Sequence, residues 1–443
     1  METLVSLREG IASGRLKGCT ELKISDGLDE FPKEILSLSA SLELLVLSGN
    51  QLRSLPPEFA QLKQLKIAFF NNNKFESFPA TLANCPKLEM ISFKSNGIQA
   101  VPEGVLSPVV RWLILTDNQI GTLPDDIGRL TRLQKLMLAG NRLRSLPEAL
   151  SKCTNLELIR LSANSLTSLP AWLFSLPKLT WLAYAGNPFC ETTERLEKQR
   201  QSAAQIPSID ERELVLGEVL GQGASGVIYR SEWKGETVAV KLFKGEITSD
   251  GLPVDEMRAC LGAGAHPNLV SVVGRLERDK ETVGLVFSFI SDDYQNLGGP
   301  PSLSSCTRDT YDEEVSFTLP VVLRILGGVS SAVQQLHKQG ITHGDLYAHN
   351  ILTNAVGDSI LGDFGAASFF DIADREESEA LMRLESRAFG CLIEDLLTRC
   401  CMDEANKTDV LQLQILQRIQ TRCFSSAVAD RLLMTEICKL LSE

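Results

Sequence analysis

Two short segments in the last quarter of the chain hold polar side chains whose types and spacing could support phosphate chemistry. The first runs from His343 to Asn350 and includes Asp345, and the second begins at Asp363. A carboxylate such as Asp345 can accept a hydroxyl proton, and the oxygens of Asn350 and Asp363 are hard ligands that suit Mg²⁺. Each residue type is common on protein surfaces, but the ordered combination predicts a phosphoryl-transfer site.

A glycine-rich segment earlier in the chain could approach a nucleotide, because glycines let the backbone come close to phosphates. A strand is expected before it, over residues 214–220, and a second strand resumes at Ile228, whereas a dinucleotide site would need a helix there. A glycine-rich hairpin without a ligand is the alternative. The predicted nucleotide contacts in this stretch are Leu220, Gly221, Gln222, Gly223, Ala224, Ser225, Gly226, Val227 and Ile228.

A lysine follows this hairpin at the end of an alternating apolar strand, Val238-Ala239-Val240-Lys241. Such a residue could be a plain edge lysine, but its position after the glycines favours a phosphate contact. A lysine in that role needs an anion to hold it, and Glu256 lies in the next predicted helix. Asp255 beside it is the alternative partner.

These motifs together resemble the protein kinase family over residues 214–443, and Asp363-Phe364-Gly365 and His266-Pro267-Asn268-Leu269-Val270 strengthen the likeness. The resemblance implies an α+β bilobal fold that binds adenine between its lobes and uses ATP and Mg²⁺. It also implies that Lys241 holds phosphates, that Glu256 orients Lys241, that Asp345 is the base and that Asn350 and Asp363 bind the metal. Further ATP contacts implied by the resemblance are Ala239, the gatekeeper Phe287, the hinge at residues 288–290 and Phe289 within it.

The catalytic loop departs from the family pattern at three positions. Gly344 replaces the arginine that normally pairs with an activation-loop phosphate, which argues against activation by that route. The usual catalytic-loop cation is also missing, because Tyr347 and His349 stand at the two places where it can occur. Transition-state charge would then rest more on magnesium and Lys241.

The segments around this loop are also unusual. The stretch after Asp363 is short, lacks Ala-Pro-Glu and leads to a helix expected near Arg387, so the peptide platform is reduced and Arg431 is left without its usual glutamate. Ser368 and Ser378 are its only hydroxyl residues before Ser386. An insert at residues 291–318, with Gly and Pro pairs, is expected to be a mobile loop.

Three readings of the kinase-like half follow. The first is an active protein kinase, with a weak preference for Ser/Thr over Tyr. The second is a nucleotide-binding scaffold without catalysis, or a repeat adaptor whose kinase-like half is inert. The third is a small-molecule phosphotransferase of the aminoglycoside or choline kinase type, which the His-Gly-Asp-Leu spelling also resembles.

The first half of the chain is a repeat array. Asparagines recur from Asn50 to Asn187 at intervals of 23, 23, 22, 23, 23 and 23 residues, each within a Leu-x-x-Leu-x-Leu-x-x-Asn frame. This is the leucine-rich repeat, in which a short strand turns apolar side chains inward and the Asn satisfies backbone groups at the turn. Stacked repeats share one core, so the sequence predicts an α/β solenoid, or horseshoe, over residues 1–190.

The alternate strand positions of the repeats are predicted to face the concave side. They form rows of apolar and aromatic side chains, which usually mark a contact surface. We expect a protein or peptide partner there, the alternative being that these side chains pack on the chain's own other domain or loops. The residues chosen as partner contacts are Phe69, Trp112, Met137 and Trp181.

Composition and charge set the broad class. The chain has 443 residues and a formal net charge of -12, of which residues 1–200 carry about +3 and the rest about -15, an unfavourable field for nucleic acid. A polar stretch at 191–212 suits a capping helix and linker before a kinase domain at 213–443. The eleven cysteines show no pairing or zinc pattern, and no signal peptide or membrane span is apparent, which predicts a cytoplasmic protein.

Overall fold

The computed structural model describes residues 2–190, 205–245, 247–279, 281–401 and 406–442. The chain divides into two compact units, Met1–Leu176 and Pro177–Glu443. The second unit begins ahead of the boundary predicted near residue 190, because the last repeat strand groups with the kinase-like half. The predicted capping helix and linker fall largely on residues 191–204, which lie outside the described residues.

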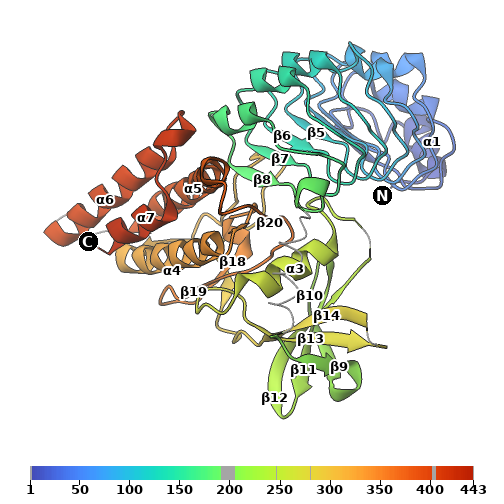
Figure 1. Cartoon of the computed structure of the whole chain (residues 1–443). Helices are drawn as coiled ribbons and strands as arrows, with labels where there is room; N and C mark the ends of the chain where they lie inside the picture. Colours follow the sequence, from blue (N-terminus) through green and yellow to red (C-terminus); the bar gives the residue numbers. More distant parts are fainter. Residues whose placement is uncertain (1, 191–204, 246, 280, 402–405, 443) are drawn as a thin grey trace. The chain divides into compact units, whose positions relative to one another are not determined.

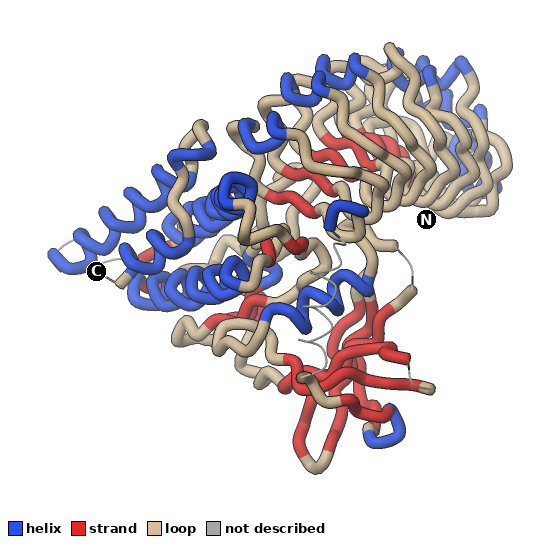
Figure 2. The backbone as a smooth tube through the Cα atoms, viewed as in Figure 1, coloured by secondary structure: helices blue, strands red, loops and turns tan. Residues whose placement is uncertain are grey.

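The first unit contains short parallel strands, one for each repeat (Figure 1). Neighbouring strands pair in register, so that Leu22 pairs with Leu45 and Leu45 with Ala68. The middle residue of each strand is buried, as the frame predicts, and short 3₁₀ helices return the chain on the other side (Figure 2). The strands are β1 (Glu21–Lys23), β2 (Leu44–Val46), β3 (Ile67–Phe69), β4 (Met90–Ser92), β5 (Trp112–Ile114), β6 (Lys135–Met137) and β7 (Leu158–Arg160), and the 3₁₀ helices are η1 (Lys33–Leu38), η2 (Pro57–Gln61), η3 (Ala80–Asn84), η4 (Asp125–Arg129), η5 (Glu148–Lys152) and η6 (Ala171–Ser175).

The repeat asparagines link successive turns of the solenoid. The amide nitrogen of Asn73 donates to the carbonyl oxygens of Leu47 at 2.8 Å and Phe70 at 3.0 Å, and its Oδ1 accepts from the Leu52 amide at 2.9 Å. Each such side chain satisfies backbone groups of two repeats that no strand or helix pairs. The structure therefore confirms the physical role predicted for the periodic Asn.

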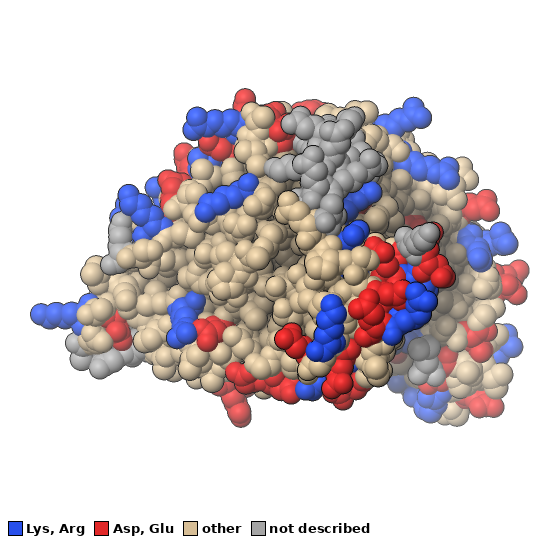
Figure 3. Space-filling view, turned by 60° about the horizontal axis from the view of Figure 1, so that its bottom comes forward, with Lys and Arg blue, Asp and Glu red and all other residues tan. Residues whose placement is uncertain are grey.

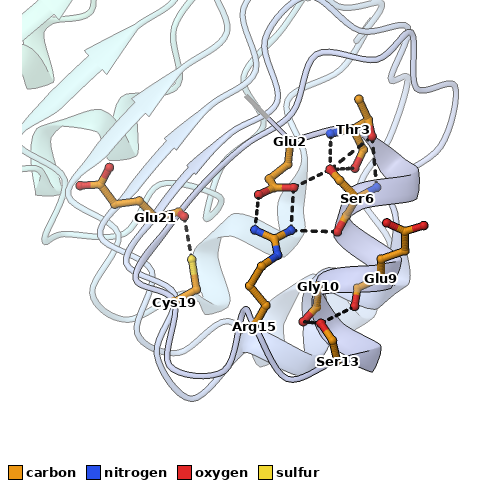
Figure 4. A network of polar contacts seen from close by, with 9 residues as sticks. All are labelled: Glu2, Thr3, Ser6, Glu9, Gly10, Ser13, Arg15, Cys19 and Glu21. Atoms are coloured by element: carbon orange, nitrogen blue, oxygen red, sulfur yellow. Dashed lines mark hydrogen bonds and ion pairs between the residues drawn. The ribbon is translucent and has the colours of Figure 1, made fainter.

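A helical cap precedes the first repeat strand (Figure 4). Helix α1 (Leu4–Ala12) begins with a capping box, in which the Thr3 hydroxyl accepts from the Ser6 amide at 3.1 Å and the Ser6 hydroxyl accepts from the Thr3 amide at 2.8 Å. The Arg15 guanidinium donates to both Glu2 oxygens, at 2.8 and 3.0 Å. The bonds from Arg15 and Ser6 lower the pKa of Glu2 to about 2, so this link stays ionic at neutral pH.

The second unit contains a six-stranded, mainly antiparallel sheet whose first hairpin contains the glycine-rich segment. Strand order is β10-β11-β12-β14-β13-β9, and only the β13–β9 pair is parallel. Val238 and Val240 point to one face, where they pack with Ile209, so Ala239 and Lys241 face the other way. The strands are β9 (Ser208–Asp210), β10 (Val215–Gln222), β11 (Gly226–Trp233), β12 (Glu236–Phe243), β13 (Val272–Arg278) and β14 (Glu281–Ser288), and helix α3 (Pro253–Ala263) follows β12.

The remainder of the second unit is mainly helical (Figure 1). Its helices are α4 (Leu319–Lys338), α5 (Arg375–Leu397), α6 (Lys407–Cys423) and α7 (Met434–Leu441). Within the described ranges α4 alone is long and apolar enough, by length and composition, to cross a membrane, and 50% of its most apolar window is buried inside the structure. The remaining short strands are the last repeat strand, β8 (Trp181–Ala183), and β15 (Gln295–Asn296), β16 (Phe317–Thr318), β17 (Ile341–Thr342), β18 (Ile351–Thr353), β19 (Ser359–Leu361), β20 (Ser368–Phe369) and β21 (Cys400–Cys401).

Two expectations about the loops need correction. Helix α5 begins at Arg375 rather than near Arg387, because Asp374 caps it by accepting from the Glu377 amide at 3.1 Å. The insert at 291–318 is not a free loop, since β15 and β16 pair with strands outside it and Arg308 binds helix α5. The segment after Asp363 is therefore shorter than the sequence suggested, and the insert is anchored.

Candidate active site

The loop between β17 and β18 brings Asp345 and Asn350 into direct contact. The side-chain amide nitrogen of Asn350 donates to the Asp345 carboxylate and to the Asp345 backbone carbonyl oxygen, both at 2.9 Å. Because the nitrogen is used in this way, the carbonyl oxygen of Asn350 is the atom that can bind a cation. The pair thus combines a held carboxylate with a hard oxygen donor on one loop.

His343 ties this loop to the segment that carries Asp363. Its Nδ1 accepts from the Asp345 amide at 3.3 Å, so Nε2 carries the proton and donates to the Gly362 carbonyl at 2.8 Å. The imidazole is fully buried, and its ring lies 5.4 Å from that of Phe364. This link places the two predicted metal-binding segments side by side.

Asp363 adopts a backbone conformation that is rare for residues other than glycine. Its φ is 53°, and its Oδ1 accepts from the Gly365 amide at 3.1 Å. A non-glycine residue in this region costs on the order of 1–3 kcal/mol and is often found at functional sites. The neighbouring Phe364 is buried, with 1% of its surface exposed, and anchors the turn in the core.

Glu385 supports the catalytic loop and was not foreseen in the sequence. It lies on α5, accepts from the Gly344 amide at 2.7 Å and contacts His337 Nε2 at 2.8 Å. Burial alone would raise the pKa of Glu385, but its hydrogen bonds with His337 and with the Gly344 amide lower it below the usual value. The glutamate therefore stays ionised inside the unit and fixes the backbone one residue before Asp345.

Lys241 and Glu256 form a buried ion pair between β12 and α3. Their side chains are only 13% and 3% exposed. Burial alone would lower the pKa of Lys241, but Glu256 and Asp363 raise it above the ordinary value, so the ammonium group stays charged. The charge of Asp363 therefore influences Lys241, which connects the sheet with the segment predicted to bind the metal. Asp255, the alternative partner, instead binds Arg258 at 3.0 Å.

The glycine-rich segment forms the predicted hairpin between β10 and β11. Gln222 pairs with Val227, and the Gly223 amide donates to the Gly226 carbonyl at 2.9 Å to close the turn. A side chain at Gly226 would lie 2.3 Å from the Leu242 carbonyl oxygen, so this position requires glycine. By contrast, Gly221 and Gly223 face open space, as a loop that covers a ligand would.

Ala239 and Phe287 are register partners in neighbouring strands and share a face with Lys241. The structure thus groups these predicted adenine-site residues on the side of the sheet away from the Val238 core. Phe289 has other neighbours, because the Arg230 guanidinium lies 4.6 Å from its ring centre. It also lines a cavity of about 530 Å³ with residues 265–267 and 288–291.

The short segment after Asp363 has no exposed serine. Ser368 and Ser378 are 0% and 4% exposed, and Ser368 accepts from the Tyr184 amide at 2.9 Å. Arg431, also fully buried, makes no ion pair within the described part of the chain. It donates instead to backbone carbonyl oxygens of Ser425, Leu179 and Pro177, at 3.0, 3.2 and 2.8 Å.

The predicted partner contacts on the repeats differ in exposure. Phe69 and Trp112 are half-buried, and the Lys135 ammonium lies 4.4 Å from the Trp112 ring centre. Met137 is 8% exposed. Trp181 is 2% exposed, because its ring stacks within the second unit on Tyr347, so it does not offer a surface to another protein. The alternative foreseen for these rows, packing within the chain, holds for Trp181.

The donors near Asp345 fit a magnesium ion that arrives with phosphates. Mg²⁺ in nucleotide sites is usually held by one or two protein oxygens, with phosphates and waters completing six ligands. Asn350 Oδ1 and the Asp363 carboxylate would supply such a pair. No group of three or more His, Cys, Asp or Glu side chains that could hold a metal alone occurs in the described ranges.

Comparison with known proteins agrees with this geometry. Residues 214–383 match the protein kinase domain, and residues 41–62, 108–165 and 131–189 match leucine-rich repeats. The probable serine/threonine-protein kinase gdt4 of Dictyostelium discoideum is 36% identical over 144 residues, which is 32% of this chain and 8% of that protein. The probable serine/threonine-protein kinase gdt2 of the same organism is 30% identical over 167 residues, 36% of this chain and 9% of that protein.

Two further similarities cover limited regions. Cyclin-dependent kinase 11.1 of Caenorhabditis elegans is 30% identical over 186 residues, 38% of this chain and 24% of that protein. A leucine-rich-repeat protein structure from Leptospira interrogans has 28% identity and a TM-score of 0.33, covering 39% of this chain and 50% of the other. The chain spans between 8% and 24% of the curated relatives' lengths. It carries leucine-rich repeats followed by a protein kinase domain.

Proposed function

We propose that the chain is a protein kinase that transfers the γ-phosphoryl group of ATP to serine or threonine hydroxyls. The observation that carries the proposal is the convergence of the Asp345–Asn350 pair, Asp363 and the Lys241–Glu256 ion pair in one unit. The printed names of gdt4 and gdt2 support serine/threonine specificity.

Each of these residues has a defined task in the proposed reaction. Lys241, kept charged by Glu256, would hold the α- and β-phosphates, and Asn350 and Asp363 would bind Mg²⁺. ATP would supply the phosphoryl group as the substrate, and Mg²⁺ held by Asn350 and Asp363 would offset the negative charge of its phosphates. Asp345 would accept the proton of the acceptor hydroxyl while the hydroxyl oxygen bonds to the γ-phosphorus. The bond between the γ-phosphorus and the β-phosphate oxygen would break at the same time, which releases ADP.

A phosphate-transfer assay with the purified full chain, Mg²⁺ and ATP labelled in the γ-phosphate tests this proposal. Label is expected on serine or threonine of a protein acceptor and not in a reaction with Asp345→Asn. Thermal stabilisation by Mg-ATP without transfer would support a nucleotide-binding scaffold instead. Label found only on an aminoglycoside or choline would support a small-molecule phosphotransferase.

We also propose that the repeats recruit a protein through Phe69, Trp112 and Met137. The half-buried aromatic side chains of β3 and β5 support this surface. On the face seen in Figure 3, acidic and basic side chains are interspersed, without a broad area of basic side chains there. All eleven cysteines are free thiols, which supports a cytoplasmic site of action.

The recruitment proposal has its own test. Trp112→Glu should raise KM for a whole-protein substrate and leave transfer to a short peptide unchanged. Arg144→Glu, which reverses an exposed charge elsewhere on the repeats, is the matched control. Equal KM values of the two variants and the intact chain for the whole-protein substrate would show that this surface does not recruit the substrate.

A further inference from the structure

Three aromatic rings in the second unit lie in series through the catalytic loop and form an aromatic stack, in which the first pair is stacked and the second is tilted. The ring of Trp181 lies 4.3 Å from that of Tyr347 with an interplanar angle of 9°, and Tyr347 lies 5.1 Å from His349 at 31°. The Trp181 indole also donates to the Leu346 carbonyl at 3.1 Å. The last repeat strand, β8, thus contacts the loop that carries Asp345 through both a ring and a hydrogen bond.

The far end of the stack is held by Asp309, from the insert after the hinge. One carboxylate oxygen contacts His349 Nδ1 at 2.6 Å, and the other accepts from the Ala348 amide at 2.6 Å. This side chain is only 4% exposed. Burial would lower the pKa of His349, but the hydrogen bond that it donates to Asp309 and the nearby Asp345 and Asp363 raise it.

The insert is fixed before it reaches Asp309. Arg308 donates to Glu394 and to Asp395 of α5, each at 2.5 Å, and to the Cys391 carbonyl at 3.1 Å. Farther along, the Arg399 guanidinium lies 3.9 Å from the ring centre of Tyr311. Asp309 is therefore presented by an anchored segment, as a positioning group must be.

Trp181 and Asp309 border the same small cavity. Trp181, Arg308, Asp309 and Tyr347 line a cavity of about 10 Å³, which has room for at most one water molecule. Tyr347 is 4% exposed and Ala348 is fully buried. Packing this close transmits a displacement at either end to the loop between them.

We propose that Trp181 and Asp309 are positioning residues that clamp the catalytic loop from two sides. The clamp supplies the rigid support that the short segment after Asp363, with its buried serines, does not obtain by phosphorylation. This inference rests on the proposed kinase function. It assigns a catalytic purpose to the last repeat and to the insert, two segments outside the recognised kinase motifs.

Steady-state kinetics of the full chain test the clamp. Asp309→Asn leaves one carbonyl oxygen to accept from both the Ala348 amide and the His349 ring, which each contact a separate oxygen of Asp309. Trp181→Phe keeps an aromatic ring but removes the indole N–H donor. Each should lower kcat about 10- to 100-fold with KM for ATP within about twofold, because a displaced loop misplaces Asp345. Asp309→Glu, which keeps both acceptor oxygens, should restore part of kcat.

The matched controls are Asp312→Asn, an exposed acid of the same insert, and Trp172→Phe, a tryptophan for whose indole nitrogen the structure gives no partner. The kcat of the double variant Asp309→Asn/Trp181→Phe should be at most about threefold below that of either single variant. The two effects should therefore not multiply, because both ends act on one loop. Unchanged kcat in both single variants, or a fall in melting temperature with kcat retained, overturns the clamp.

A second readout does not need activity. The chain has four histidines, so ring-labelled histidine gives a simple NMR spectrum in which His349→Gln assigns one signal. Asp309→Asn should shift the His349 ring signals and leave those of His266 unchanged, whereas Asp312→Asn should shift neither. An unmoved His349 signal overturns the clamp. Absence of phosphate transfer by the intact chain would instead count against the proposed function, with the NMR result still testing the clamp.

Discussion

The amide nitrogen of Asn350 donates to the carboxylate of Asp345 at 2.9 Å, so the predicted metal ligand also holds the predicted base. Removal of this side chain should therefore affect two tasks at once. We expect Asn350→Ala to lower kcat at least 100-fold and to raise the Mg²⁺ concentration needed for half-maximal rate. Asn354→Ala, in the nearby β18–β19 turn, should change neither quantity more than about twofold. A magnesium dependence identical to that of the intact chain would contradict the assignment.

The Lys241–Glu256 pair allows stability to be separated from catalysis. Lys241→Met should abolish transfer and lower the free energy of unfolding by about 3–5 kcal/mol, because it leaves Glu256 buried without its cation. Lys241→Met/Glu256→Met should recover most of that stability but no activity, since two apolar side chains pack where the ions were. Thermal denaturation and phosphate transfer measured on the same preparations check this. Recovery of transfer in the double variant would show that Lys241 does not contact the phosphates.

The catalytic motifs could be predicted because their chemistry depends on residue type and local spacing. The hairpin at 220–228, the Asp345–Asn350 loop and the periodic Asn residues are local patterns, and the structure has all of them. The start of α5 was missed although Asp374 and Glu377 have capping-box spacing, since the first turns of α5 are highly charged and resemble a loop. The spacing of Asp374 and Glu377 is the sequence signal that could have predicted the start of α5.

The supporting residues could not be predicted, because their partners lie far along the chain. Glu385 looks like a solvated helix residue until its bond to Gly344 is seen, and Asp309 looks like one acid of a polar insert. Trp181 occupies the same repeat position as Trp112, and strand alternation predicts its face but not what covers it. Tertiary contacts of this kind carry no local sequence signature.

Gly344 is required by the close approach of two backbone segments. Its φ is 72°, and a side chain there would lie 2.4 Å from the Ala366 carbonyl oxygen and 2.8 Å from that of Leu182. We expect Gly344→Ala to lower the free energy of unfolding by at least about 2 kcal/mol. Gly327→Ala, in α4 with open space around the new methyl group, should instead stabilise by about 0.5–1 kcal/mol. Chemical denaturation of the two variants would show the contrast, and equal effects would contradict the structural reason given for the glycine.

Glu385 predicts a pH dependence of stability with a definite sign. Because its folded-state pKa is lowered, its contribution is present above the ordinary value of 4.5 and is lost as pH falls through the folded-state pKa. Glu385→Gln should therefore lower the unfolding free energy by about 1–3 kcal/mol at pH 7 and by less near pH 4. Melting temperatures of the variant and the intact chain at both pH values test this. A difference that grows toward acid pH would contradict the prediction.

The most direct test of the account is the rate of phosphate transfer to protein serine or threonine by the intact chain and by Asp345→Asn, with Mg-ATP binding followed in the same samples. We predict equal nucleotide binding and a rate at least 100-fold lower for Asp345→Asn, because only the proton acceptor is lost. Asp358→Asn, a half-exposed acid in the β18–β19 turn, should behave as the intact chain. Equal transfer rates for the intact chain and Asp345→Asn, or bound Mg-ATP without any transfer by the intact chain, would contradict the account.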